Sequence, residues 1–300
     1  MSSPSSQPRL QKFEIPGRVA FATVNGGLAK AVVTTKTSTA EVFLHGAQVT
    51  GFQKNGEPPL LFLSSKSYFA PGKAIRGGVP VCFPWFGPRE GKPIHGFARM
   101  TEWELVETAA TPDGSVTLNL QLPETALGQG GWPAAKVNFI ATIGDKLAME
   151  LVVANTTAQD FIFEDLLHTY FAVADIAHVS IRGLNGAHYI DKTDNFARKL
   201  EAGDEIRISS QVDRVFLDTP ATVVIHDAKL RRRISVEKTG SASTVVWNPW
   251  TDWAKATADF GDEEYKQMLC VESGNVGENK ITLAPGATAA LKTVISSLAG

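Results

Sequence analysis

Cysteine is scarce in this sequence, and the spacings typical of metal and nucleotide sites are missing. Only Cys82 and Cys270 occur among 300 residues, which is too few for a disulfide framework and is typical of a reducing compartment. Zinc sites usually contain close pairs such as Cys-x-x-Cys or His-x-x-x-His, and neither pair occurs here. The sequence also has no phosphate-binding loop that ends in Gly-Lys-Ser/Thr. We therefore expect neither a metal ion nor a nucleotide cofactor.

The sequence also lacks an excess of charge of either sign and lacks long apolar runs. Its 29 basic and 31 acidic residues give a net charge of -2, so no overall field attracts nucleic acid or an anionic membrane. Residues 1–17 do not contain the apolar core of a secretory signal, and no later run is long enough to span a bilayer. We expect a cytoplasmic protein that binds a small molecule and that binds neither nucleic acid nor a membrane.

Apolar residues that alternate with polar ones dominate the chain and predict antiparallel strands. One predicted hairpin pairs residues 137–143 with residues 147–153 around Gly144, and a second turns near Asp227. Helical periodicity is rare, and the best candidate for a short helix covers residues 262–266. Many short strands separated by Gly, Pro, Asn and Asp predict a large all-β sandwich or barrel.

The composition indicates one large domain. Hydrophobic residues make up 43% of the chain and charged residues 20%, which is typical of a globular protein with a sizeable core. No repeat or flexible linker follows the polar start of the sequence. We expect residues 1–16 to be a flexible segment and residues 17–300 to form a single domain.

The segment 74–100, AIRGGVPVCFPWFGPREGKPIHGFARM, concentrates residue types that suit a binding site. Glycine allows a close approach of the backbone, proline fixes the path of a loop, and aromatic rings suit the apolar face of a sugar. Arg76 and Arg99 lie near the two ends and offer planar donor groups that match phosphate or carboxylate. His95 lies in the loop between them. The segment predicts a site for a small, anionic, sugar-like ligand.

Four further residues are candidates for this site, and each has two interpretations. His168 lies in an apolar stretch, so it is either a hydrogen-bonded core residue or a group that faces a pocket. Glu272 follows the strand-like run Met-Leu-Cys-Val and could act as a base or cap a turn. Asp213 could bind a ligand or form a salt bridge at a sheet edge. Trp247 could form a platform for a sugar or pack in the core.

Several uncommon strings in the sequence, taken in order, resemble the motifs of one family. The strings are IRGGVPVCFPWFG, HGFAR, the apolar run that ends at His168, GLNGAHYIDK, VDRVFLDTP, VVWNPW and EYKQMLCVESGNV. Together they resemble the aldose 1-epimerases, in the branch of glucose-6-phosphate 1-epimerases (hexose-6-phosphate mutarotases), over residues 21–295. Trp85 departs from this pattern, because many members have glutamine there. The resemblance implies an antiparallel β-supersandwich of the galactose mutarotase type with few short helices.

The resemblance also implies a role for the candidate residues. His168 becomes the general acid and Glu272 the general base of a ring-opening reaction that needs no cofactor and no metal. The implied substrate-binding residues are Arg76 and Arg99 for a phosphate, His95 beside the sugar ring and Asp213 for the sugar hydroxyls. Trp247 joins them as a candidate aromatic platform, on its residue type alone. The expected function is interconversion of the α and β anomers of a hexose 6-phosphate, foremost glucose 6-phosphate, by a monomeric isomerase.

Two other functions stay open at this point. A non-catalytic protein that binds or senses a sugar phosphate could keep the arginines but would have no use for His168 and Glu272 together. A glycoside hydrolase normally needs two carboxyl groups, whereas the pair here is histidine with glutamate. Because apolar surroundings favour neutral histidine, we hypothesise that Glu272, with Asp213, lies close enough to His168 to keep it protonated.

Overall fold

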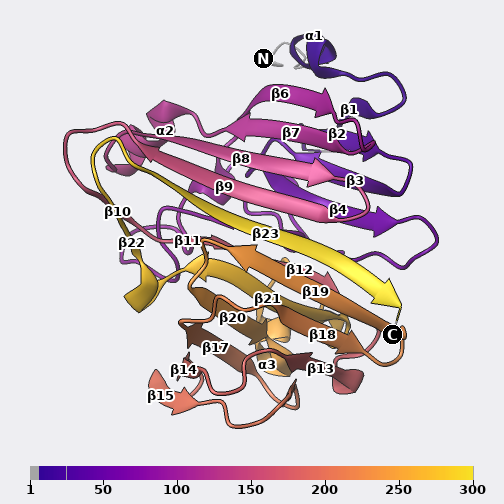
Figure 1. The fold of residues 1–300 in the computed structure, drawn as a ribbon, viewed down its shortest axis with the longest axis vertical. Helices are drawn as coiled ribbons and strands as arrows, with labels where there is room; N and C mark the ends of the chain where they lie inside the picture. Colours follow the sequence, from indigo (N-terminus) through magenta and orange to yellow (C-terminus); the bar gives the residue numbers. More distant parts are fainter. Residues whose placement is uncertain (1–6, 25, 300) are drawn as a thin grey trace.

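Strands form most of the structure, a computed structural model that describes residues 7–24 and 26–299 (Figure 1). The helical segments in this part of the chain are short: α1 (Gln7–Leu10), η1 (Gln11–Phe13), η2 (Ala98–Met100), α2 (Glu124–Gly130), η3 (Ile176–His178), α3 (Trp250–Ala256), η4 (Glu264–Gln267) and η5 (Gly277–Asn279). The predicted helix at residues 262–266 corresponds to the 3-10 turn η4, whereas α2 and α3 were not predicted. The expected all-β class with few short helices is confirmed.

The largest antiparallel sheet, called here the long sheet, has the order β16-β13-β18-β19-β23-β9-β8-β7-β6 among the described residues. Its strands are β6 (Glu104–Ala110), β7 (Val116–Gln121), β8 (Ala135–Ile143), β9 (Leu147–Asn155), β13 (Val179–Arg182), β16 (Ile206–Arg207), β18 (Val223–Asp227), β19 (Arg232–Thr239) and β23 (Thr288–Ala299). β23 lies in the middle and pairs with β9 on one side and β19 on the other. In Figure 1 it is the long yellow arrow that joins the strands from the two halves of the chain.

The sequence pattern of β8 and β9 explains why they pair. Buried and half-buried residues alternate along both strands, so one face of the hairpin covers the core. The turn between them closes where the Gly144 N–H donates to the carbonyl of Lys146 at 3.0 Å. The predicted hairpin around Gly144 is confirmed, and so is the one that turns after Asp227, between β18 and β19.

A second antiparallel sheet, called here the pocket sheet, has the order β15-β14-β17-β20-β21-β11-β5, and β12 also pairs with β21. Its strands are β5 (Val81–Cys82), β11 (Asp165–Leu167), β12 (Tyr170–Ala172), β14 (His188–Asp191), β15 (Ala197–Leu200), β17 (Val212–Leu217), β20 (Ser243–Asn248) and β21 (Met268–Asn275). β21 is buried on both faces. Leu269 and Val271 join the main core, so Cys270 and Glu272 point to the opposite face.

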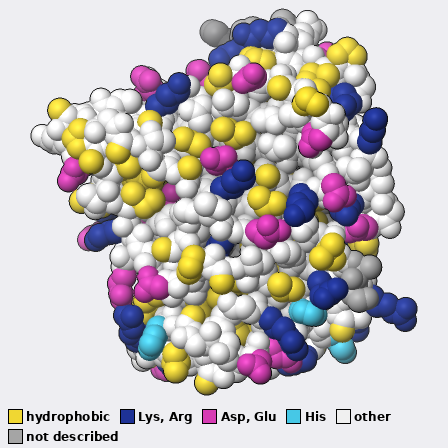
Figure 2. Space-filling model, in the orientation of Figure 1, with side chains coloured by type: hydrophobic (Ala, Val, Ile, Leu, Met, Phe, Trp, Pro, Cys, Tyr) yellow, Lys and Arg dark blue, Asp and Glu magenta, His cyan; other side chains and the backbone are white. Residues whose placement is uncertain are grey.

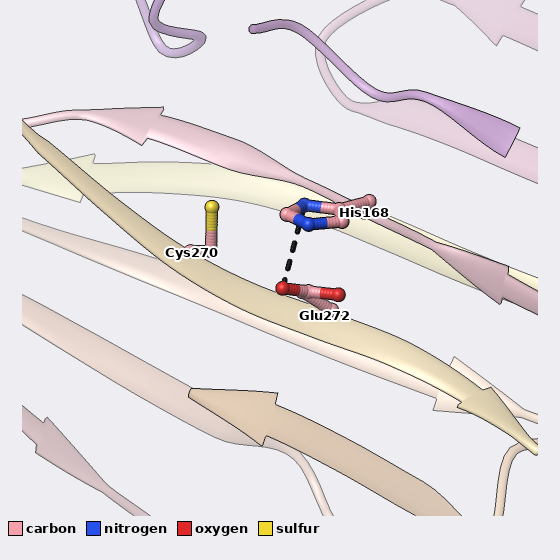
Figure 3. A group of neighbouring side chains, drawn as sticks. All are labelled: His168, Cys270 and Glu272. Atoms are coloured by element: carbon pink, nitrogen blue, oxygen red, sulfur yellow. Dashed lines mark ion pairs between the residues drawn. The ribbon is translucent and has the colours of Figure 1, made fainter. Parts of the chain in front are cut away.

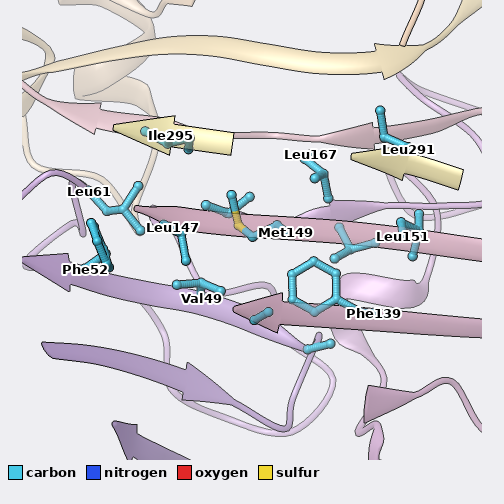
Figure 4. Close-up of a cluster of buried hydrophobic side chains, with 14 of the residues drawn as sticks. Val49, Phe52, Leu61, Phe139, Leu147, Met149, Leu151, Leu167, Leu291 and Ile295 are labelled. Carbon is cyan, nitrogen blue, oxygen red and sulfur yellow. The ribbon is translucent and has the colours of Figure 1, made fainter. Parts of the chain in front are cut away.

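The main core draws on the long sheet, the pocket sheet and a smaller antiparallel sheet of β1 (Val19–Thr23), β2 (Ala29–Thr34), β3 (Ser38–Phe43) and β4 (Gln48–Lys54). Val49 of β4, Met149 and Leu151 of β9, and Leu167 of β11 belong to the same buried cluster (Figure 4). Each buried side chain of this size stabilises the fold by about 1.5–3 kcal/mol. A short pair, β10 (Phe161–Phe163) with β22 (Ile281–Leu283), completes the strands.

The start of the chain is described only in part. Residues 1–6 of the expected flexible segment lie outside the described residues. From residue 7 onward the chain forms α1 and η1, Leu10 is buried, and the Thr108 hydroxyl donates to the carbonyl of Phe13 at 2.6 Å. The division into a segment 1–16 and a domain 17–300 stays a prediction.

The surface in Figure 2 carries basic and acidic side chains side by side, without a large area of one sign. This distribution is in keeping with the net charge of -2. None of the helices in the described part of the chain is long and apolar enough to cross a membrane.

Candidate active site

All seven candidate residues line one pocket, whose floor is the pocket sheet and whose wall is the segment 74–100. The residues are Arg76, His95, Arg99, His168, Asp213, Trp247 and Glu272. The two-residue period of the strands explains the floor, because Val271 and Val246 face the main core while their neighbours Glu272 and Trp247 face the pocket. Strand register adds Asp213, which lies opposite Trp247.

His168 and Glu272 form a buried pair in the middle of the pocket (Figure 3). His168 Nδ1 lies 3.3 Å from Glu272 Oε1, and the side chains are 8% and 1% exposed. The contact is not aligned as a hydrogen bond, since His168 Nδ1 and Glu272 Oε2 both lack a hydrogen-bond partner among the described residues. Buried polar atoms usually have partners. The pair thus leaves two polar atoms without partners among residues that line the pocket.

Burial shifts both groups of this pair toward their uncharged forms. It raises the pKa of Glu272 well above the usual range, and the charge of Asp213 adds to the rise. Burial also lowers the pKa of His168 well below its usual value, assisted by the nearby charges of Arg99 and Arg76. The closeness of Glu272 to His168 is confirmed, whereas burial and the two arginines oppose the charged form of His168, and its protonation stays a prediction. The sequence did not place these arginines beside His168.

His95 is held in one orientation by the loop that carries it. Its backbone is left-handed, with φ of 63°, and the Gly87 N–H donates to His95 Nδ1 at 3.1 Å. Nδ1 is thus an acceptor, and in the neutral ring the proton lies on Nε2. Burial, followed by the charge of Arg99, lowers the pKa of His95. His95 therefore offers an N–H donor next to His168, whose ring centroid is 5.5 Å away.

The glycine after His95 is required by a close backbone contact. Gly96 has φ of +74°, and a Cβ atom there would lie 2.0 Å from the carbonyl oxygen of Phe83. Only glycine fits such a position. The close packing of Gly96 on Phe83 thus helps to hold the preceding residue, His95, at the wall of the pocket.

The two arginines differ in how their charges are compensated. Arg76 forms a two-pronged ion pair with Asp259, with Nε–Oδ2 at 3.3 Å and Nη2–Oδ1 at 3.2 Å, and also donates to the Tyr170 hydroxyl at 3.3 Å. Arg99 is buried and donates to the Ile94 carbonyl at 2.8 Å. Within the part of the chain that the structure describes, Arg99 has no carboxylate partner and its Nε is unsatisfied. A buried arginine of this kind in a pocket can bind an anion.

Sequence reasoning did not select four side chains that belong to the site. Tyr170, Lys192 and Trp253 line the pocket, and Asp259 lies behind Arg76. Tyr170 stacks on His168 with ring centroids 4.8 Å apart, and its position two residues after His168 was a usable signal. Lys192 follows β14, and its Nζ lies 3.3 Å from Asp213 Oδ1. Trp253 lies in helix α3 and Asp259 in the irregular segment after it, and neither lies in a sequence pattern that points to the pocket.

Two aromatic residues of the segment 74–100 have different positions. Phe86 lines the pocket. Trp85 is 4% exposed, stacks on Trp132 at a centroid distance of 5.8 Å and donates from Nε1 to the carbonyl of Pro93. Trp85 therefore supports the loop from behind, and it is not among the residues that line the pocket.

One group of side chains has the donor atoms of a metal site. The ligand atoms of His168, Cys270 and Glu272 lie within 4.8 Å of one another (Figure 3), and nitrogen, sulfur and oxygen donors suit zinc. Sequence inspection for close pairs missed this group, although residues 270 and 272 share one face of a strand. Burial raises the pKa of the Cys270 thiol well above its usual value, and Arg76, Arg99 and Lys192 line the same pocket. The positive charges disfavour a cation here.

Comparison with known proteins identifies the family. The aldose 1-epimerase family matches residues 30–296. A protein of Cenchrus ciliaris, provisionally named glucose-6-phosphate 1-epimerase, is 38% identical over 87% of this chain and 82% of its own length. A protein of Escherichia coli K12 with the same provisional name is 36% identical over 80% of this chain and 81% of its own. The crystal structure of a provisionally named mutarotase from Salmonella typhimurium superposes with a TM-score of 0.89 and 30% identity, covering 96% of each chain.

The fold, the pocket and these similarities define a sugar isomerase on a galactose mutarotase-like β-supersandwich. The chain belongs to the aldose 1-epimerase family. Its class of reaction is the interconversion of sugar anomers.

Proposed function

We propose that this protein interconverts the α and β anomers of a hexose 6-phosphate, with glucose 6-phosphate as the main substrate. The observation that carries the proposal is the pairing of His168 with Glu272 at 3.3 Å in a pocket that also holds Arg99, a buried arginine without a carboxylate partner among the described residues. The provisional names of the relatives support the same substrate.

In the proposed reaction, the pair opens and closes the sugar ring. Glu272 takes the proton of the anomeric hydroxyl while His168 gives a proton to the ring oxygen, so the C1–O5 bond breaks without free charge. The aldehyde turns about the C1–C2 bond, and reclosure with the two roles reversed gives the other anomer. Each positioned group contributes about 10²- to 10⁴-fold to the rate, and the reaction consumes no cofactor.

The charges in the pocket act on both members of the pair. The charges of Arg99 and Arg76 help to lower the pKa of His168, and the charge of Arg99 also opposes the rise in the pKa of Glu272. A bound phosphate dianion offsets these charges and therefore favours the protonated form of both groups. In this proposal the phosphate helps His168 to serve as the acid, while Arg99 and Lys192 favour the carboxylate form that Glu272 needs as the base.

The remaining pocket residues are assigned by their chemistry. Arg99 binds the phosphate, and Arg76 assists with the N–H groups that Asp259 and Tyr170 leave free. The N–H of His95 donates to an oxygen near the ring. Asp213 accepts from the sugar hydroxyls, and Trp247, edge-on to His168 at a centroid distance of 5.9 Å, covers an apolar face of the sugar.

Location and assembly belong to the same proposal. Cys82 and Cys270 are free and buried, which is in keeping with a reducing, cytoplasmic compartment. We also propose that residues 17–300 form one domain and that the protein acts as a monomer.

Magnetisation-exchange NMR tests the function directly. The exchange rate between the anomers of glucose 6-phosphate, galactose 6-phosphate and free glucose is measured with and without the enzyme. We expect acceleration for the phosphorylated sugars, strongest for glucose 6-phosphate, and loss of acceleration in Glu272→Gln. A protein that binds glucose 6-phosphate without accelerating the exchange of any of these sugars would instead be the non-catalytic sensor.

A further inference from the structure

Lys192 is tied to Asp213 by both its backbone and its side chain. The Lys192 N–H donates to the Asp213 carbonyl at 2.9 Å, and Nζ lies 3.3 Å from Asp213 Oδ1. The ammonium also lies over the ring of Phe86, 4.6 Å from the centroid. Lys192 therefore joins the floor of the pocket, through β17, to its wall, through the loop that carries Phe86.

Lys192 favours the ionised form of Asp213. Burial raises the pKa of Asp213, and Lys192 is the cation that opposes the rise. Lys192 also opposes the rise in the pKa of Glu272, to which the Asp213 charge contributes. Further titratable or charged groups surround the two carboxylates among the described residues: Asp191 of β14, His168 between β11 and β12, Tyr170 of β12, Arg76, His95 and Arg99 of the segment 74–100, Cys82 of β5 and Cys270 of β21.

We infer that Lys192 is a positioning residue, which holds Asp213 ionised and oriented to accept hydrogen bonds from the sugar hydroxyls and favours the carboxylate form of Glu272. This inference rests on the proposed function, because it assigns a sugar to Asp213. An ionised carboxylate accepts at both oxygens, whereas a protonated one loses acceptor capacity and becomes a donor. Lys192 occupies one side of Oδ1 and leaves the rest of the carboxylate to the ligand.

The chain offers a matched control for Lys192. Lys30 makes the same pair of contacts outside the pocket, with Nζ 2.6 Å from Glu41 Oε1 and 5.8 Å from the ring centroid of Phe43. The side chains of Lys192 and Lys30 are 21% and 17% exposed. A general effect of removing a half-buried lysine should therefore appear equally in Lys30→Met and Lys192→Met.

The experiment uses two measurements that do not need turnover. In the first, carboxyl-carbon NMR follows the titration of Asp213 without sugar, in the wild type, Lys192→Met, Lys192→Arg and Lys30→Met. In the second, calorimetry measures the Kd for glucose 6-phosphate in the same four proteins. We expect Lys192→Met to move the Asp213 titration to higher pH and to weaken binding about tenfold, the scale of one hydrogen bond to a charged group. Lys192→Arg should restore most of both properties, and Lys30→Met should change neither.

The outcomes separate this inference from the proposed function. An unchanged Asp213 titration in Lys192→Met, or a shifted titration with unchanged Kd, would overturn the role of Lys192 even if the wild type accelerates anomer exchange. If the wild type accelerates no exchange but the titration and Kd shift as expected, the inference stands and the proposed catalysis fails. If glucose 6-phosphate does not bind at all, the assignment of Asp213 to sugar hydroxyls is overturned with the proposed substrate.

Discussion

Replacing Glu272 with glutamine should abolish catalysis and yet stabilise the fold. Glutamine has nearly the shape of a protonated glutamate, and its amide can donate to His168 Nδ1, which lies 3.3 Å from Oε1 in the parent protein. It cannot take a proton from the anomeric hydroxyl. We expect anomer exchange to slow by about 10²- to 10⁴-fold, which corresponds to about 2.7–5.4 kcal/mol in the barrier.

The gain in stability follows from the raised pKa of Glu272. Burial raises the pKa of this carboxyl in the fold, whereas in the unfolded chain it ionises above its ordinary pKa of about 4.3. The wild type therefore loses stability as the pH rises from about 4.3 to the folded pKa, by up to about 1.4 kcal/mol per pH unit. Glutamine does not titrate and escapes this loss.

Urea unfolding at pH 5 and pH 8 measures the difference. The advantage of Glu272→Gln over the wild type should be small at pH 5 and larger at pH 8, with unchanged m-values. A variant that is inactive and less stable at pH 8 would refute the reasoning, because Glu272 would then be a structural residue satisfied in its charged form. Retained anomer exchange would refute its role as the base.

Three further changes test other parts of the molecule. Arg99→Met should raise the KM for glucose 6-phosphate about 10- to 150-fold, since a hydrogen bond to a charged group contributes about 1.5–3 kcal/mol, and leave exchange of free glucose unchanged; equal losses on both sugars would contradict the phosphate role. Leu151→Ala, at a fully buried site, should lower the free energy of unfolding by about 2–5 kcal/mol with an unchanged KM, and urea titration with kinetics checks both. Gly96→Ala should lower Tm more than Gly114→Ala does, and it should also lower activity. Both positions have positive φ, but only a Cβ at position 96 would lie 2.0 Å from a backbone oxygen. Equal changes in Tm would argue against that contact.

The sequence predicted best those features that depend on neighbouring residues. Alternation along β8 and β9 predicted a hairpin because half of each strand's side chains enter the core. Helix α3 was missed because seven residues are too few for a periodic stripe. A turn just before it was nevertheless encoded, since the side chain of Asn248, which precedes the N-cap residue Pro249, accepts a hydrogen bond from the Trp250 N–H at 3.0 Å.

The residues of the candidate site also divide into those that the sequence indicated and those that only the tertiary fold brings together. The resemblance to family motifs selected six of the seven chosen residues, the aromatic pattern selected Trp247, and all seven line one pocket. Asp259 was missed because it lies 183 residues from Arg76 in the chain and only the tertiary fold brings the two together. The groups that oppose a protonated His168 were missed for a related reason: the motifs point to Glu272, but the effect of burial and of Arg99 on the pKa of His168 depends on distances in space.

The central position of β23 has a consequence for how the chain is made. β23 is the middle strand of the long sheet, yet it follows both β9 and β19 in the chain. During synthesis on the ribosome, these two strands emerge first, and each keeps an open edge until residues 288–299 have followed. Open strand edges with apolar faces favour association with other chains. A nascent chain of this protein is thus most in need of a chaperone just before its last strand emerges, when nearly all of its core residues are already outside the ribosome.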